Sequence, residues 1–127
     1  MANKYNLPAL QKWADHHAKT FWLKAKKVYG DKIGVLPPVK LNARLTSTAG
    51  RAWLQEGFID LSCYLMSNNP EEFAKNTIPH ELCHMIAWRL YQDKGHGKPW
   101  KHTMMTMGLP PDTYHTMETL AMAKAKK

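Results

Sequence analysis

The pattern of apolar and polar positions predicts a long helix near the start of the chain, over residues 8–29. Apolar side chains recur there at roughly helical spacing, and lysines fill much of the remainder. Pro8 suits an early helical position, and Gly30 suits the residue after the last turn. The segment therefore indicates an amphipathic helix that turns one face toward a core.

Two stretches of alternating apolar and polar residues follow, residues 39–45 and part of 52–61, and both predict strands. The intervening segment 46–51 has the composition of a turn, so we expect an antiparallel hairpin that joins the two strands. Gly57 indicates either a bulge in the second strand or a boundary between two strands.

Further helices are expected in the second half of the chain. Segment 69–76 opens with an asparagine cap and a proline, which favours a helix start. Pro79 would clash with the preceding turn, so either this helix kinks or a new one begins near Thr77. That next helix should reach about residue 91, and a short helix is expected over 99–107.

Together these elements predict one α+β domain over residues 1–127, with a basic tail at about 121–127. The expected order is an N-terminal helix, a small antiparallel sheet with a hairpin, a helix that carries the chemistry described below, and a following short helix. The length of 127 residues gives no reason for a second domain.

The net charge of +8 is unevenly distributed along the chain. Residues 1–40 carry a local balance of +6, residues 41–96 carry −1, and residues 97–127 carry +3. Basic ends favour contact with a polyanion, most simply nucleic acid, although solubility alone explains them equally well.

The first predicted helix offers a specific nucleic-acid surface. Its lysines, with Trp13 and either Phe21 or Trp22, could form a groove in which bases stack on rings. The favoured alternative is an ordinary amphipathic helix with solvated lysines and buried aromatic rings. The candidate contacts are Lys19, Lys24, Lys26 and Lys27.

The two cysteines, Cys63 and Cys83, are too few for a disulfide framework and do not form a CxxC pair. The first residues lack the apolar core of a signal peptide, and no apolar run is long enough to span a membrane. We therefore expect a cytoplasmic protein with reduced thiols and no membrane association.

The segment 80–84 reads His-Glu-x-x-His. On a helix, residues four apart lie one above the other, so His80 and His84 can bind one zinc ion. Glu81 is turned about 100° around the axis, so it is placed to act as a general base rather than as a ligand. His96, which lies between two glycines after the expected helix end, is the candidate third ligand.

The other histidines, His16, His17, His102 and His115, are left unassigned. Cys83 should point away from the metal-binding face. Two alternatives to a peptidase remain open: a basic nucleic-acid-binding protein with a structural zinc site, and a different zinc hydrolase that acts on nucleic acid. The presence of Glu81 favours peptide hydrolysis over both.

These residues resemble the SprT-like family of zinc metalloproteases, which includes the Spartan proteases. The resemblance rests on three segments: 79–84 (Pro-His-Glu-Leu-Cys-His), 95–100 (Gly-His-Gly-Lys-Pro-Trp) and 48–52 (Thr-Ala-Gly-Arg-Ala). It covers roughly residues 8–115. The spacing between the first two segments separates this chain from metzincins and gluzincins.

The resemblance implies a minimal zincin-like protease with one zinc ion, held by His80, His84 and His96, and with Glu81 as the catalytic glutamate. It also implies DNA-associated or DNA-crosslinked protein substrates, with DNA, single-stranded or at a junction, as a further partner. Many bacterial members continue into a four-cysteine zinc ribbon, whereas this chain has two cysteines. DNA dependence is therefore an open expectation.

The expected reaction is metal-assisted hydrolysis of a peptide bond, in which Glu81 accepts a proton from water and later returns it to the leaving amine. A hydrogen-bond donor for the developing oxyanion is also needed. The candidates, which the sequence does not rank, are Tyr64, Arg51, Tyr114 and His115.

Overall fold

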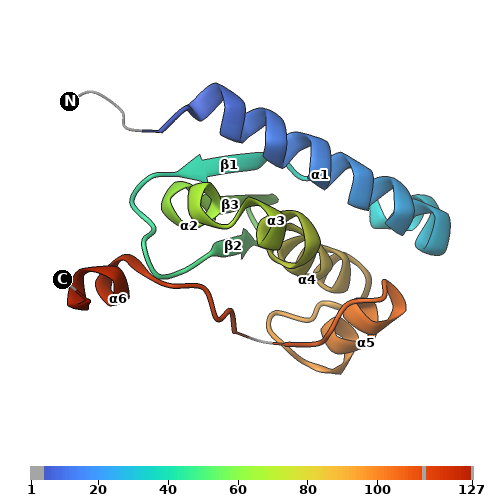
Figure 1. Ribbon diagram of the computed structural model, residues 1–127. Helices are drawn as coiled ribbons and strands as arrows, with labels where there is room; N and C mark the ends of the chain where they lie inside the picture. The colour runs from blue at the N-terminus through green and yellow to red at the C-terminus, as the bar shows by residue number, and fades with distance from the viewer. Residues whose placement is uncertain (1–4, 113, 127) are drawn as a thin grey trace.

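The computed structural model describes residues 5–112 and 114–126 and confirms the α+β class (Figure 1). The elements in chain order are α1 (Leu7–Tyr29), the 3₁₀ turn η1 (Gly30–Ile33), β1 (Val39–Asn42), β2 (Gly50–Trp53), β3 (Phe58–Ser62), α2 (Cys63–Asn68), α3 (Pro70–Glu72), the π-helical turn η2 (Phe73–Thr77), α4 (Ile78–Tyr91), α5 (Lys98–Thr106) and α6 (Leu120–Ala125).

Helix α1 confirms the first expectation almost residue for residue. Asn6 caps it, with its side-chain oxygen accepting from the backbone N–H of Ala9 at 3.1 Å. Gly30 ends it at φ 76° and ψ −163°, a backbone conformation open essentially to glycine alone. One face of the helix packs into the core through Ala14, Ala18, Phe21, Trp22 and Ala25.

The sheet is mixed, with strand order β1-β3-β2, so the expected antiparallel sheet is corrected in one respect. β1 runs parallel to β3, with Val39 opposite Ile59. The hairpin joins β2 to β3 and not residues 39–45 to 52–61, because the chain reverses inside the second stretch. Gly57 adopts φ 83° in that reversal, so the strand boundary it indicated is correct.

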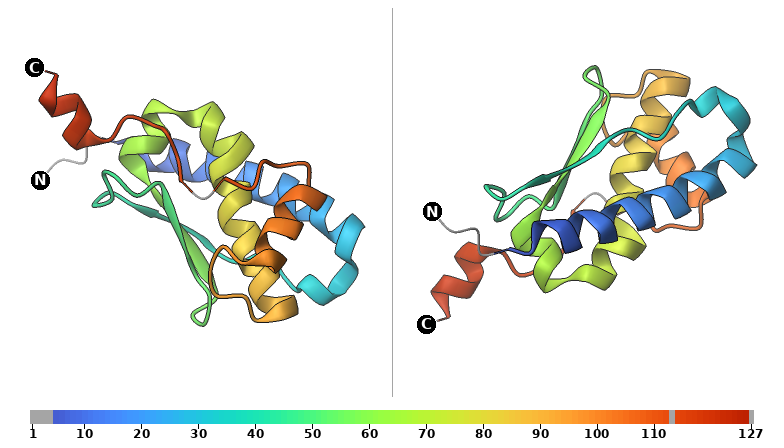
Figure 2. Two further views of the ribbon diagram at one scale, coloured as in Figure 1. Left: turned by 90° about the horizontal axis from the view of Figure 1, so that it is seen from below. Right: turned by 90° about the horizontal axis from the view of Figure 1, so that it is seen from above.

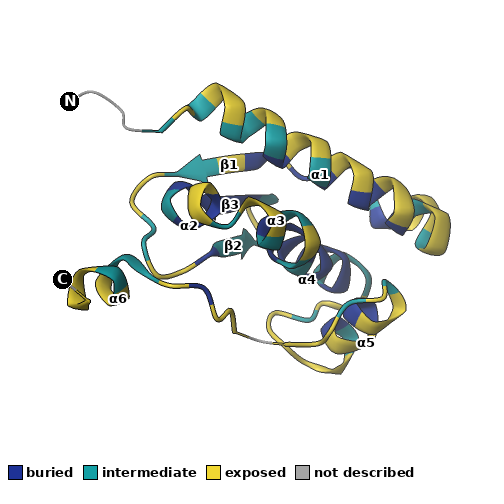
Figure 3. Cartoon of the chain, in the orientation of Figure 1, coloured by how far each residue is buried: buried dark blue, intermediate teal, exposed yellow. Residues whose placement is uncertain are grey.

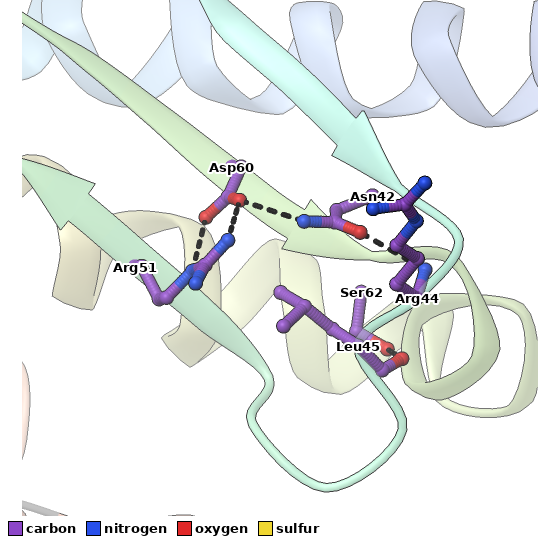
Figure 4. A network of polar contacts seen from close by, with 6 residues as sticks. All are labelled: Asn42, Arg44, Leu45, Arg51, Asp60 and Ser62. Carbon is purple, nitrogen blue, oxygen red and sulfur yellow. Dashed lines mark hydrogen bonds and ion pairs between the residues drawn. The ribbon is translucent and has the colours of Figure 1, made fainter.

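The two faces of the sheet have different partners. Because side chains alternate along a strand, Ile59 and Leu61 point to the core, where α1 and α4 pack. The opposite face carries a polar network in which Arg51 donates to both carboxylate oxygens of Asp60, at 3.1 and 2.6 Å (Figure 4). Asn42 donates to the same carboxylate at 3.1 Å. This network fixes β2 and β1 to the central strand.

The helical passage from α3 to α4 resolves the alternatives at Pro79. The chain neither stops nor restarts, because η2 is a π-helical turn in which the N–H of Ile78 donates to the carbonyl of Phe73. A π turn adds one residue to the helical turn. The carbonyl four residues before Pro79, which would clash with the proline ring in a regular α-helix, is therefore displaced. α4 then ends at Tyr91, as expected.

Helix α4 is the centre of the molecule. It lies between α1 and α5 and also contacts β2 and β3 (Figures 1 and 2). Most of its length is buried, whereas α1 is exposed along its outer side (Figure 3). A helix that is buried over most of its length is typical of a core position. The face of α4 that carries His80 and His84 is therefore largely buried and borders a cleft.

The C-terminal part of the chain returns toward the loop between β1 and β2. The N–H of Leu120 donates to the carbonyl of Thr46 at 3.1 Å, and α6 begins there. Thr119 caps α6, so the segment expected as a basic tail at about 121–127 is helical as far as Ala125; Lys127 lies outside the described residues. Within residues 5–112 and 114–126, no helix is both long and apolar enough to cross a membrane.

Candidate active site

The structure brings His80, His84 and His96 together at one point. Their Nε2 atoms lie 3.2 Å (His80 to His84), 3.0 Å (His84 to His96) and 3.4 Å (His80 to His96) apart. Two come from one face of α4, and the third comes from the loop between α4 and α5. Three convergent imidazole nitrogens form a set that could hold a metal ion.

These separations fit a tetrahedral ion. Nitrogen ligands at the usual zinc distance of about 2.0–2.1 Å, placed at tetrahedral angles, lie about 3.3 Å from one another. No cysteine or carboxylate in the described part of the chain joins the cluster, and Cys83 is buried in the core as expected. A three-histidine set of this kind leaves one position open, which is typical of catalytic rather than structural zinc.

Trp100, which had no expected role in the site, supports all three imidazoles. Its ring centroid lies 4.9 Å from that of His80, 5.0 Å from His84 and 4.5 Å from His96. Its side chain is fully buried, and its indole N–H donates to the carbonyl of His80 at 3.4 Å. The tryptophan therefore restricts the ring orientations of the candidate ligands. The feature of the sequence that could have indicated this role is its position in the Gly-His-Gly-x-x-Trp segment.

Asp93 organises the loop that presents His96, although it was not among the candidate site residues. Its carboxylate accepts from the backbone N–H of Gly95 at 2.9 Å and of Trp100 at 3.0 Å. The second bond satisfies an N–H in the first turn of α5. A Cβ atom on Gly97 would lie 3.0 Å from the same carboxylate, so any side chain there would push on Asp93.

Burial keeps the three imidazoles neutral. It lowers the pKa of His80 to about 4 and that of His84 to about 3, and the neighbouring histidines add to both effects. Burial likewise lowers the pKa of His96. Neutral imidazoles offer the free lone pair that a metal needs, so metal binding here does not require prior loss of protons at neutral pH.

Glu81 lies beside this cluster and is 7% exposed. Its Oε2 atom is 3.9 Å from Nε2 of His80, and in the described residues no hydrogen-bond donor satisfies its carboxylate. Burial raises the pKa of Glu81 to about 8, and the negative charge of Asp60 adds to this. A bound divalent cation would act in the opposite direction.

A cleft of about 500 Å³ opens onto the three histidines and Glu81. This volume lies in the range of binding pockets for small molecules and short peptide segments. One wall is the passage from α3 to α4, and another is the segment 47–50 that leads into β2. The third is formed by residues of the C-terminal return, where Nε2 of His115 lies 2.6 Å from the carbonyl of Ser47.

Of the four candidate oxyanion donors, two line the cleft and two do not. Tyr114 and His115 line the cleft, whereas Arg51 and Tyr64 do not. The Arg51 guanidinium is held by Asp60, and Tyr64 packs beside the core. Which cleft residue stabilises an oxyanion stays a prediction.

The lysines expected to contact nucleic acid lie on α1, and none of them lines the cleft. Lys26 is half-buried and pairs with Asp31 at 3.8 Å. Phe21 and Trp22 are buried, and the indole of Trp13 donates to the carbonyl of Pro70. Phe21 and Trp22 therefore pack in the core, as the amphipathic alternative predicts, and contact of these lysines with nucleic acid stays a prediction.

Comparison with known proteins identifies the relatives of this chain. The family model described as the SprT-like family matches residues 18–115. The chain belongs to the SprT-like family. Protein SprT of Vibrio parahaemolyticus is 32% identical over 111 residues, which is 78% of this chain and 67% of that protein. Protein SprT of Klebsiella pneumoniae (strain 342) is 35% identical over 106 residues, or 82% of this chain and 60% of that protein.

A third relative, Protein SprT of Actinobacillus succinogenes, is 35% identical over 98 residues, which is 76% of this chain and 57% of that protein. This SprT-like chain thus spans about half to two-thirds of the length of the curated relatives it matches. No solved structure matches it. The family and the three-histidine cluster are consistent with a metallopeptidase type of enzyme.

Proposed function

We propose that this protein is a zinc-dependent endopeptidase whose zinc ion is held by His80, His84 and His96. The observation that carries the proposal is the convergence of three Nε2 atoms within 3.4 Å beside a buried carboxylate to which none of the described residues donates a hydrogen bond. The residues fit zinc in donor type, number and spacing. When bound, zinc would polarise the carbonyl group of the substrate and lower the pKa of a bound water toward about 7.

Glu81 acts as the general base and then as the general acid. Its carboxylate accepts a proton from the attacking water and returns that proton to the leaving amine nitrogen. Burial suits this double role, because a carboxyl whose pKa is raised holds a proton more readily once it has accepted one.

An extended peptide is the substrate that the cleft geometry supports. β2 is an edge strand, with β3 on one side and no strand on the other within the described residues. Its first residue, Gly50, lines the cleft beside Glu81. A peptide that adds to this edge as a further strand would pass directly by the general base, held by backbone hydrogen bonds.

Proteins associated with DNA or crosslinked to DNA are the proposed substrates, and DNA is a proposed partner. Support comes from the net charge of +8 and the exposed Lys19, Lys24 and Lys27 on α1, away from the cleft. Contact there would bring a DNA-bound protein near the enzyme without occupying the active site.

The test is hydrolysis of a basic DNA-binding protein by zinc-loaded wild type and by Glu81→Gln, with and without single-stranded DNA. We expect wild-type cleavage, loss of at least a hundredfold in Glu81→Gln, and equal zinc content. Retained turnover by the variant would remove Glu81 from the mechanism. DNA binding without cleavage by either protein would favour the alternative function, a nucleic-acid-binding protein with a structural zinc site.

A further inference from the structure

The charge of the cleft differs from that of the rest of the molecule. The chain has 18 lysines and arginines against 10 aspartates and glutamates. Yet the described residues that line the cleft include three acids, Glu72, Glu81 and Asp112, and no lysine or arginine. A cationic group would therefore meet attraction in the cleft and repulsion over much of the remaining surface.

Glu72 is the acid best placed to act on a substrate. Residues 72, 76, 80 and 84 follow one another at intervals of four along the passage from α3 to α4, and all four line the cleft. Glu72 thus lies on the same wall as the histidines and is not a separate surface feature.

Asn76 holds the Glu72 carboxylate in place. Its side-chain nitrogen donates to both carboxylate oxygens, at 2.5 and 3.0 Å. Because the amide is neutral, the negative charge of Glu72 is oriented but not compensated. Within residues 5–112 and 114–126, no basic side chain forms an ion pair with it. An oriented, uncompensated carboxylate is suited to an ammonium or guanidinium group.

The distance between Glu72 and the histidines decides which residue of a bound peptide can reach Glu72. Eight helical residues separate Glu72 from His80, which corresponds to about 12 Å at about 1.5 Å per residue. An extended peptide advances about 3.3 Å per residue. A side chain three or four residues from the bond at the histidines therefore reaches Glu72.

A second side chain on this wall, the candidate general base, also points to a ligand. Glu81 points into the same cleft, is more than nine-tenths buried and has no hydrogen-bond donor among the described residues. Its carboxylate oxygens are not among the fully buried atoms that lack a partner, so they reach the open space of the cleft, where a ligand can contact them. Glu72 and Glu81 therefore line the same ligand-accessible cleft.

We propose that Glu72 selects substrates that carry lysine or arginine three or four residues from the bond to be cut. The selection rests on the proposed peptidase function, since it assigns a specificity to the same cleft. It also agrees with a basic, DNA-associated class of substrate.

Peptide binding to zinc-loaded Glu81→Gln tests the proposal separately from cleavage. The probes are fluorescent ten-residue peptides in which one position at a time holds lysine or norleucine, an uncharged residue of similar length. We expect lysine to tighten binding about fivefold to tenfold at one position. Adding Glu72→Gln should abolish that preference, and Glu72→Lys should replace it with a preference for glutamate.

Glu71→Gln is the matched control, because Glu71 is exposed and does not line the cleft. It should leave the lysine preference unchanged, and thermal unfolding should show that all variants are folded. A preference that survives Glu72→Gln, or is absent from the Glu81→Gln parent, overturns the proposal. Lysine-selective binding with no wild-type cleavage of any peptide would refute the peptidase function and leave the selectivity standing.

Discussion

Gly50 lies directly against Glu81: a Cβ atom on Gly50 would sit 3.1 Å from Cγ of the glutamate. The same atom would lie 3.1 Å from the carbonyl of Asp60, so a side chain at position 50 would press on both the strand partner and the helix. Glycine thus allows the edge strand to approach α4 closely. The contact sets where the general base can lie relative to the histidines.

Gly50→Ala should therefore lower kcat by about tenfold to a hundredfold, because small displacements of a catalytic group cost this much. Zinc affinity should change by less, since no ligand contacts Gly50. Steady-state kinetics on a peptide substrate and zinc titration measure the two effects. The control is Gly57→Asn, in the hairpin turn, where a Cβ atom meets nothing within 4 Å and asparagine tolerates positive φ. Equal kcat for wild type and Gly50→Ala would show that the glycine does not position Glu81.

Asp93→Ala should weaken zinc binding about tenfold to a hundredfold, although Asp93 is not a candidate ligand. The substitution removes the acceptor for the N–H groups of Gly95 and Trp100, which frees the loop around His96. Competition with a chromophoric chelator measures the affinity. Asp93→Asn keeps one acceptor oxygen, so its zinc affinity should lie between those of wild type and Asp93→Ala. The control is Asp31→Ala, at an exposed position, whose zinc affinity should match wild type. An unchanged affinity in Asp93→Ala would mean that the loop is fixed by other contacts.

The unfolding free energy of chelator-treated protein should depend on pH through Glu81. Burial places the pKa of Glu81 at about 8 in the folded state, above its ordinary value of about 4.3. The folded state therefore binds more protons between these values, and the stability that this proton contributes is lost as pH rises through about 8. Wild type should lose a few kcal/mol relative to Glu81→Gln between pH 4.5 and 8. The histidines contribute equally to the pH dependence of both proteins, so their effect cancels in the difference. If the unfolding free energies of the two proteins changed in parallel with pH, the raised pKa of Glu81 would be contradicted.

Elements governed by local chemistry were predictable from the sequence. Asn6 and Gly30 fix the ends of α1 through contacts within one or two turns, and Tyr91 ends α4 before Gln92, which adopts the left-handed conformation at φ 59°. The pairing of His80 with His84 follows from helix geometry alone. The nearness of His96 was inferred from its spacing and flanking glycines.

Features that depend on distant contacts were not predictable in the same way. The turn composition of segment 46–51 suggested a hairpin, but parallel pairing of β1 with β3 is decided by packing on α1 and α4. The short helix α2, capped by Ser62, gave no clear periodic signal. The roles of Asp93 and Gly50 exist only through tertiary contacts, which a single sequence does not display.

Zinc K-edge X-ray absorption of the protein loaded with one equivalent of zinc tests the central claim most directly. Three imidazole nitrogens are expected at about 2.0–2.1 Å with one oxygen donor in the remaining position, and one imidazole should be lost in His96→Ala. A sulfur scatterer at about 2.3 Å, or an unchanged spectrum in His96→Ala, would contradict it.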